Sequence, residues 1–381
     1  MKKPILVFAV MMIFGILLNA QVRSAHYEVI VSGGNAGIYS SELEQRFAVY
    51  NSIFRFDPAL LVSPLRVRVF TDKDEYDSYV GSRLGNPRPG AVYLHYRSPE
   101  NRELVILEGS EEERRLIPHQ AFIQFLRAFI PDPPAWIREG FAVYFNTLEF
   151  DRASDALVYE ENLIWLETAK SLTVDPETVF LADSSFTETS QASAAGSGFH
   201  AASWSLVSFF MADKNSEYYR ALTDSFMVLS PGATVEENSR AMYRRLTLFS
   251  PIDVLTGNYN AFIAGKKTFA ELVEEGQKAY DAGNSAAAED FFRRAAELRS
   301  SHHIPCYYLG LLAYGDKKYN EAEEFYLMAL NNGAERALIQ YARGVNAAAA
   351  GRRSEALVFL EEASAEERYK ARSDELIRRL R

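Results

Sequence analysis

The residues best suited to chemistry lie in one stretch, 116–145, whose sequence is LIPHQAFIQFLRAFIPDPPAWIREGFAVYF. It contains His119 and Glu139, and imidazole and carboxylate groups are ligands that proteins use to bind zinc. Two histidines four apart on a helix lie on one face and can share an ion, and a glutamate between them can activate the bound water. A third ligand from another helix leaves the fourth position open for that water. The stretch can therefore be compared with this arrangement position by position.

Two predicted helices carry these side chains. Pro118 is expected to kink the first helix or to begin a new one just before His119, because a proline inside a helix removes a hydrogen bond. The second helix is expected over 134–148, and it opens with a proline in the first turn, where proline is tolerated. The histidine and the glutamate thus lie on consecutive helices.

A small sheet is expected to precede these helices. Four short runs with alternating apolar residues are predicted strands, and two segments between them have helical character. The strands are 26–33, 65–72, 90–96 and 102–109, and the helices are 40–54 and 72–81. Strand, helix, strand, helix, hairpin and then helices predict an α+β domain. The segment 182–198 is rich in Gly, Ser and Ala and is predicted to be a mobile loop, after which an apolar helix spans 199–211.

This order of elements resembles that of the gluzincin metallopeptidases, in particular the peptidase MA-like families that occur in bacteria with tetratricopeptide tails. Those families carry His-Glu-x-x-His on one helix and Pro-x-Trp-[Leu/Ile]-x-Glu-Gly-x-Ala-x-[Tyr/Phe] on the next. The second run is matched here by Pro134, Trp136, Ile137, Glu139, Gly140, Ala142 and Tyr144. The resemblance covers 66–261 and implies a zincin-like domain, a small mixed sheet plus helices, over 26–262.

The first run departs from the family pattern at two positions. The resemblance places His119 at the first ligand position and Glu139 at the third. The second ligand position holds Ile123, which has no lone pair to give. The general-base position holds Gln120, whose neutral amide cannot accept the proton of a water molecule. Two protein ligands are too few for a stable catalytic zinc site, so the resemblance implies a peptidase architecture without peptidase chemistry.

Other roles remain open for these residues. His119 could be a buried histidine that hydrogen-bonds to Glu139 and keeps the two helices in register, and we favour this interpretation over metal binding. An atypical zinc site would need a further ligand, for which His95 and His200 are available. His200 could also be the remnant of a transition-state stabiliser, although a role in helix packing is the expectation. Gly140 is expected to allow two helices to approach closely.

Composition limits the other possible functions. Hydrophobic residues make up 48% and aromatic residues 13% of the chain, as in folded globular proteins, and 381 residues favour two or three domains. The net charge of -10 argues against nucleic-acid binding, which requires a basic surface. Serine-hydrolase elbows, phosphate-binding glycine loops and paired cysteines are not found in the sequence.

The beginning of the chain has the form of a signal peptide. Lys2 and Lys3 precede an apolar run at 5–18, and Ala20 is a small residue at the expected cleavage point. The run is shorter than the roughly 20 residues that a membrane-spanning helix needs. We therefore expect cleavage of the segment 1–20, no stable membrane span, and a mature protein that is periplasmic or otherwise extracytoplasmic.

The C-terminal third repeats with a period of 34 residues. Small residues recur at 276, 310 and 344 (Gly), at 288, 322 and 356 (Ala) and at 295, 329 and 363 (Ala), and a large residue recurs at Phe292, Tyr326 and Leu360. Small residues allow paired helices to approach, and the large residue is expected to fill the wedge between one pair and the next. The pattern resembles tetratricopeptide repeats: an all-α array over 269–381, with three repeats to about residue 370 and a terminal helix over 371–381. The lone cysteine, Cys306, falls at an inward-facing position and is predicted to be buried.

These features together predict an exported, catalytically inactive peptidase-like protein. It would bind a protein or peptide partner of the cell envelope through its cleft and its repeats, with 90–96 as the edge strand for peptide pairing. No cofactor is expected. One alternative is an active zinc metallopeptidase with an atypical ligand set, for which zinc would be the cofactor. The other is a repeat-mediated adaptor whose N-terminal domain is purely structural.

Overall fold

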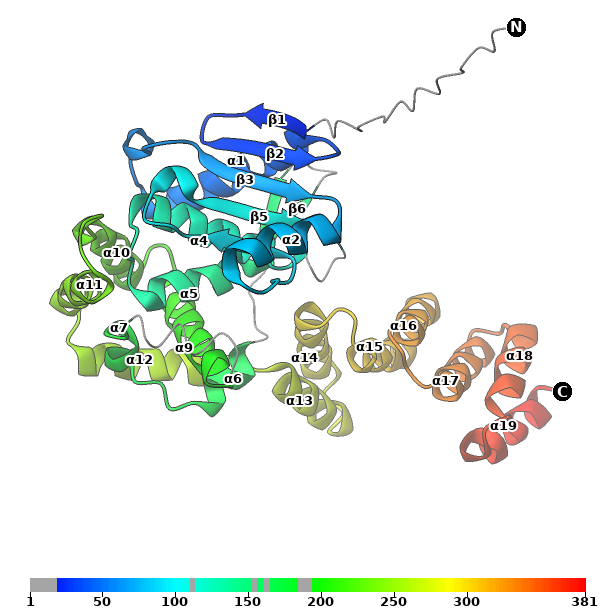
Figure 1. Ribbon diagram of the computed structural model, residues 1–381. Helices are drawn as coiled ribbons and strands as arrows, with labels where there is room; N and C mark the ends of the chain where they lie inside the picture. The colour runs from blue at the N-terminus through cyan, green and yellow to red at the C-terminus, as the bar shows by residue number, and fades with distance from the viewer. Residues whose placement is uncertain (1–18, 110–113, 152–155, 160–164, 184–193) are drawn as a thin grey trace, which may run out of the picture. The chain divides into compact units, whose positions relative to one another are not determined.

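The computed structural model describes the chain from Asn19 to Arg381, apart from 110–113, 152–155, 160–164 and 184–193 (Figure 1). The chain divides into two compact units, Met1–Ala264 and Gly265–Arg381. The first unit combines a sheet with helices, and the second is built of helices, which agrees with the predicted α+β layout. Residues 1–18 of the predicted signal peptide and 184–193 of the predicted loop lie outside the described residues. None of the described helices is both long and apolar enough to cross a membrane.

Five strands form the main sheet of the first unit. They are β1 (Asn19–Arg23), β2 (Tyr27–Ser32), β3 (Leu65–Phe70), β4 (Ala91–Leu94) and β5 (Glu103–Leu107), and their order across the sheet is β1-β2-β3-β5-β4. β2, β3 and β5 are parallel, whereas β1 and β4 each run antiparallel to their neighbour. The sheet is therefore mixed, and the prediction that 90–96 contains an edge strand is confirmed. β1 was not predicted, and it overlaps the last two residues of the predicted signal peptide.

Two helices cover one face of this sheet (Figure 1). α1 (Ala36–Phe54) begins earlier than the predicted 40–54, because the side chain of Asn35 caps it by accepting a hydrogen bond from the Gly37 N–H. α4 (Ile117–Phe129) packs beside it, and the rings of Tyr50 and Phe122 meet with centroids 5.3 Å apart. This aromatic contact fixes α4, which carries His119, above the parallel strands.

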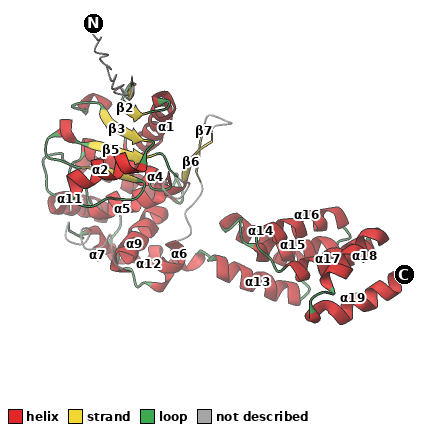
Figure 2. Cartoon of the chain, turned by 45° about the vertical axis from the view of Figure 1, so that its right-hand side comes forward, coloured by secondary structure: helices red, strands yellow, loops and turns green. Residues whose placement is uncertain are grey.

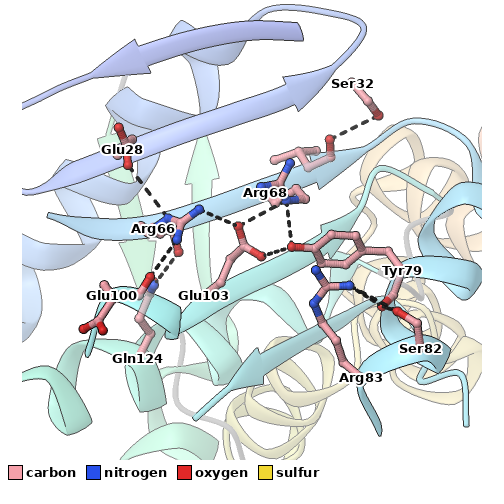
Figure 3. A network of polar contacts seen from close by, with 11 residues as sticks. Glu28, Ser32, Arg66, Arg68, Tyr79, Ser82, Arg83, Glu100, Glu103 and Gln124 are labelled. Carbon is pink, nitrogen blue, oxygen red and sulfur yellow. Dashed lines mark hydrogen bonds and ion pairs between the residues drawn. The ribbon is translucent and has the colours of Figure 1, made fainter. Parts of the chain in front are cut away.

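The opposite face of the sheet is covered in part by α2 (Lys73–Leu84), whose Tyr76 and Val80 pack on Phe70 and Val105. Beyond α2, this face carries polar side chains. Figure 3 shows Arg68 and Tyr79 converging on the carboxylate of Glu103, with Arg68 Nε 3.1 Å from Glu103 Oε1. Glu103 is 4% exposed, so these contacts supply the hydrogen bonds that a buried carboxylate needs.

The region after α4 differs from the prediction at two boundaries. α5 (Ala135–Tyr144) ends before 148, because η3 (Phe145–Thr147) and a hairpin of β6 (Leu148–Asp151) and β7 (Ala156–Tyr159) follow it. The backbone N–H and C=O groups of β6 pair with those of β7, so they are not free for the hydrogen bonds of a longer helix. α9 (Ala194–Met211) begins inside the predicted loop 182–198, which is therefore too long. The remaining helices of this part are η1 (Pro58–Leu60), η2 (Pro99–Asn101), α6 (Leu166–Ser171), α7 (Pro176–Phe180), α10 (Glu217–Ser225), η5 (Phe226–Val228), α11 (Val235–Phe249) and α12 (Ile252–Gly265).

The second unit is a series of antiparallel helix pairs followed by one helix (Figure 2). The pairs are α13 (Phe269–Asp281) with α14 (Ser285–Leu298), α15 (His303–Gly315) with α16 (Tyr319–Asn331), and α17 (Arg336–Ala349) with α18 (Arg353–Ala363). The final helix, α19 (Glu367–Leu380), begins before the predicted 371. Cys306 is 2% exposed, as predicted, and burial raises the pKa of its thiol.

The periodic glycines of this unit lie against the periodic large residues. A methyl group added at Gly310 would lie 2.5 Å from the ring of Tyr326, and one added at Gly344 would lie 2.7 Å from Leu360. Each contact joins the two helices of one repeat, whereas the large residue was expected to fill the wedge between one pair and the next. Phe292 does both: it lies 2.8 Å from such a methyl group at Gly276 and also stacks on Tyr308 of the next repeat, with ring centroids 4.6 Å apart.

Candidate functional site

Three helices of the first unit bring two histidines to one carboxylate. Glu139 of α5 lies between His119 of α4 and His200 of α9. His200 Nε2 is 3.0 Å from Glu139 Oε2, and His119 Nε2 is 3.7 Å from the same oxygen. The histidine rings themselves have centroids 6.2 Å apart. The structure therefore unites the two predicted metal candidates with His200, which the sequence analysis gave as an available further ligand, as a remnant of a transition-state stabiliser or, by expectation, as a helix-packing residue.

Gly140 explains how α9 comes so close to α5. A methyl group on this residue would lie 2.6 Å from the carbonyl oxygen of Ser203 and 2.8 Å from a methyl group of Val207. Both contacts are shorter than real side chains allow, and one is with the backbone of α9. The prediction that Gly140 permits close helix approach is confirmed, and this approach is what places His200 within reach of Glu139.

The carboxylate of Glu139 is fully engaged by the protein. It is 3% exposed; Arg138 Nε donates to its Oε1 at 2.7 Å, and His200 Nε2 contacts its Oε2. Burial acts to raise the pKa of Glu139, but the hydrogen bond from His200 and the charge of Arg138 outweigh it and hold the pKa well below its usual range. Glu139 is therefore ionised at neutral pH.

His119 does not make the hydrogen bond that we expected. Its 3.7 Å separation from Glu139 is too long for one, and His200 occupies that place instead. Burial lowers the pKa of His119 to about 4, although the charge of Glu139 opposes this shift. The imidazole is therefore neutral at pH 7. It is His200, and not His119, that hydrogen-bonds to Glu139 between helices.

Gln120 and Ile123 both have structural contacts. The side-chain oxygen of Gln120 accepts a hydrogen bond of 3.0 Å from the backbone N–H of Tyr93 in β4. Gln120, which holds the general-base position of the resemblance, thus connects α4 to the edge strand. Ile123 is 9% exposed and belongs to the hydrophobic core.

The residues present do not fit a zinc centre as they stand. Within the described ranges, no three His, Cys, Asp or Glu side chains have the arrangement of a metal site. The guanidinium of Arg138 lies against Glu139 and would repel a divalent cation there. Ile123 offers no donor atom. We therefore derive no chemical step through a metal.

The sequence did not point to Arg138, although its Nε donates to Glu139 Oε1 at 2.7 Å. It is 7% exposed, and it occupies an unspecified position of the motif that carries Glu139. A charged residue in the middle of a helix of otherwise apolar character is the signal that could have revealed it, because such residues are rarely buried without a partner. Trp136, which matches the family motif, packs against Phe180, with ring centroids 4.8 Å apart.

The third histidine of the sequence prediction, His95, does not join this group. It follows β4, and its ring centroid lies 5.8 Å from that of Tyr93. Burial, and then the charges of Arg127, Arg102 and Arg138, lower the pKa of His95 to about 3. His95 therefore belongs to a basic environment, whereas His119 and His200 lie beside an acidic residue.

Comparison with known proteins adds no relative. No family model matches the chain, and none of the curated proteins matches it either. Function is therefore inferred from the contacts of the site itself.

The two neutral histidines predict a loss of stability in mild acid. In the unfolded chain, His119 and His95 are protonated near pH 6.5. In the folded protein their pKa values are lower, about 4 for His119 and about 3 for His95. The free energy of unfolding should therefore have its full value above about pH 6.5 and should decrease as the pH falls below that value. Urea unfolding at pH 7.5, 6 and 5 measures this slope above the range where carboxylates titrate. The double variant His119→Gln, His95→Gln should flatten it, and an unchanged slope would contradict the assignment.

Proposed function

We propose that this protein is an exported, catalytically inactive member of the peptidase-like class that binds a peptide or protein of the cell envelope. In this proposal the first unit is zincin-like and the second is a tetratricopeptide array. The observation that supports this proposal most directly is that the side chains at the third-ligand and general-base positions of the family motif are hydrogen-bonded to other groups of the protein. Glu139 is held by Arg138 and His200, and Gln120 is held by the Tyr93 backbone.

The edge position of β4 supports peptide binding. β4 is an edge strand with one side unpaired by any described strand, and edge strands accept extended peptides by main-chain hydrogen bonds. Gln120 already occupies the outward N–H of Tyr93. A peptide that pairs along β4 must therefore displace the amide of Gln120 or use the neighbouring groups of the strand, which limits the affinity of the unmodified edge.

The second unit supports a further binding surface. Helix-pair repeats often present a concave face to a partner, and Tyr307 and Tyr341, which are one repeat apart, lie at partly buried positions on the first helices of the second and third pairs. Their hydroxyl-bearing rings provide contact area at a low entropic cost. This surface is the basis of the adaptor alternative, in which the repeats carry the whole function.

The test is metal content together with peptide cleavage. We expect the purified full chain, incubated with excess zinc and then desalted, to hold much less than one zinc per chain and to cleave no unstructured protein such as casein. The same measurements on His119→Ala and His200→Ala should be unchanged. Stoichiometric zinc that disappears in either variant would refute the proposal.

A zinc peptidase is the second candidate, and one observation favours it. Glu139 Oε2 lies 3.0 Å from His200 Nε2 and 3.7 Å from His119 Nε2. Two ligands at about 2.1 Å from one tetrahedral ion would be roughly 3.4 Å apart. The Arg138 guanidinium would have to leave Glu139 for this site to form. The zinc measurement separates the two candidates, because only the second requires both histidines for metal retention.

Peptide binding by variants of the full chain, measured on a peptide array, distinguishes the adaptor alternative from binding along β4. Gln120→Ala frees the Tyr93 N–H and should strengthen binding of extended peptides if β4 is the docking edge. Tyr307→Ala combined with Tyr341→Ala should leave those peptides bound. If only the tyrosine variant changes binding, the repeats carry the function and the first unit is structural.

A further inference from the structure

Arg127 of α4 is a partly buried cation without an anion beside it. Its Nε is buried and has no hydrogen-bond partner, and no described residue forms an ion pair with it. Asp132 attracts Arg127 electrostatically but makes no ion pair with it in the part of the chain that the structure describes. A buried N–H that has no acceptor is costly. Arg127 therefore has one buried donor without an acceptor in the protein.

The surroundings of Arg127 contain further basic groups beside the carboxylates of Asp132 and Glu139. Burial, and then the charge of Arg138, lower the pKa of Arg127 to about 10. The buried Nδ1 of His95 also has no hydrogen-bond partner. Arg102 is near, but it donates to the backbone carbonyls of Tyr96 and Arg97, which carry no net charge. The cluster thus has unused donors and an excess of positive charge.

The carboxylates nearby do not neutralise this cluster. Glu139 gives its Oε1 to Arg138 at 2.7 Å and its Oε2 to His200 at 3.0 Å. This carboxylate therefore hydrogen-bonds to Arg138, whereas Arg127 has only the longer-range attraction of Asp132 and Glu139. A single added carboxylate would satisfy the remaining charge, because the guanidinium fork matches two carboxylate oxygens.

The cluster lies on α4 and at the end of the edge strand β4. His119, Ile123 and Arg127 are four residues apart on α4, so they share one helix face and form a line. Gln120 of the same helix bonds to Tyr93 of β4, and His95 directly follows the end of that strand. A peptide extended beside β4 would therefore bring one of its ends, or a side chain near that end, to Arg127.

We propose that Arg127, with His95 and Arg138 around it, binds the carboxylate of a peptide lying along β4. This inference rests on the proposed function and names its ligand: a peptide with a free C-terminus at the His95 end of the strand. A Glu side chain offers the same chemistry and is distinguished by the experiment.

The experiment uses calorimetric titration of the full chain with N-acetyl-pentaalanine as the free acid and as the C-terminal amide. The acid should bind about tenfold more tightly or better, as expected for a charge-assisted hydrogen bond. Arg127→Gln should abolish the difference between acid and amide. Arg220→Gln, an exposed arginine of α10, is the matched control and should keep it. An amide that contains an internal Glu tests the side-chain source, and its binding like the acid would assign the site to acidic side chains.

A second measurement keeps the inference testable without a peptide. Acetate, compared with chloride at equal ionic strength, should raise the Tm of the wild-type chain and not that of Arg127→Gln. The variant alone should be at least as stable as the wild type, because it loses an unpaired cation. Equal binding of acid and amide with no acetate effect would overturn the inference and leave the proposed function standing. An Arg127-dependent acetate effect without binding of either peptide would keep the anion site and overturn the assignment of its ligand to a peptide along β4.

Discussion

Gly140→Ala is expected to lower the free energy of unfolding of the first unit by about 1–3 kcal/mol or more, the usual cost of overpacking a rigid core. The added methyl group would lie 2.6 Å from the carbonyl oxygen of Ser203 and 2.8 Å from Val207. The first of these atoms is backbone in the middle of α9, so it cannot rotate away. The helix itself would have to shift, and the contact between His200 and Glu139 would lengthen with it.

Urea unfolding followed by circular dichroism measures this loss, with each unit fitted separately because a chain of two units need not unfold in one step. Gly257→Ala is the matched control, since Gly257 also lies in a helix of the first unit and a methyl group there meets nothing within 4 Å. It should be neutral or slightly stabilising, because alanine is the better helix former. If Gly140→Ala matched that control, α5 and α9 would not be in the contact described.

Glu139→Ala is expected to have the largest effect of any single change at the site, about 3–5 kcal/mol, which is typical of removing one partner from a buried ion pair. Arg138 is 7% exposed and its Nε donates to Glu139. Without the carboxylate, its charge would be buried without compensation, and His200 would lose its hydrogen bond. Both penalties fall on the folded state.

Two further variants separate charge from hydrogen bonding in this pair. Glu139→Gln keeps the size and an acceptor oxygen, so it should destabilise less than Glu139→Ala. The double variant Glu139→Ala, Arg138→Met removes both charges and should recover part of the loss, as replacement of whole buried ion pairs does elsewhere. The prediction fails if Glu139→Ala unfolds at the wild-type urea concentration.

The sequence predicted well what depends on local periodicity. Alternation of apolar residues located β2, β3, β4 and β5, and the 34-residue period placed the helix pairs of the second unit. The helices of His119 and Glu139 were predicted for the same reason. In contrast, β1 and the β6–β7 hairpin were missed, because their pairing partners and not their own patterns define them.

The site itself was predicted only in part. His119 and Glu139 lie close together, but the position of His200 depends on how closely α9 approaches Gly140, and this is a property of tertiary packing. The pairing of Glu139 with Arg138 was also beyond sequence reasoning, since neighbours in a helix usually point to different sides. The hydrogen bond to Glu139 comes from His200 and not from His119, and this depends on distances between helices that the spacing of residues along the sequence does not predict.

The three glycine contacts of the second unit have a consequence for how cooperatively it unfolds. Gly276, Gly310 and Gly344 each close a helix pair onto a large residue of the same repeat, so every pair has its own internal closure. Stability in such arrays is a sum of repeat terms and nearest-neighbour terms. A substitution that disrupts one of these contacts would therefore destabilise that helix pair and its direct neighbours, while pairs farther away remain folded. The unit would then unfold in segments and not in one cooperative step.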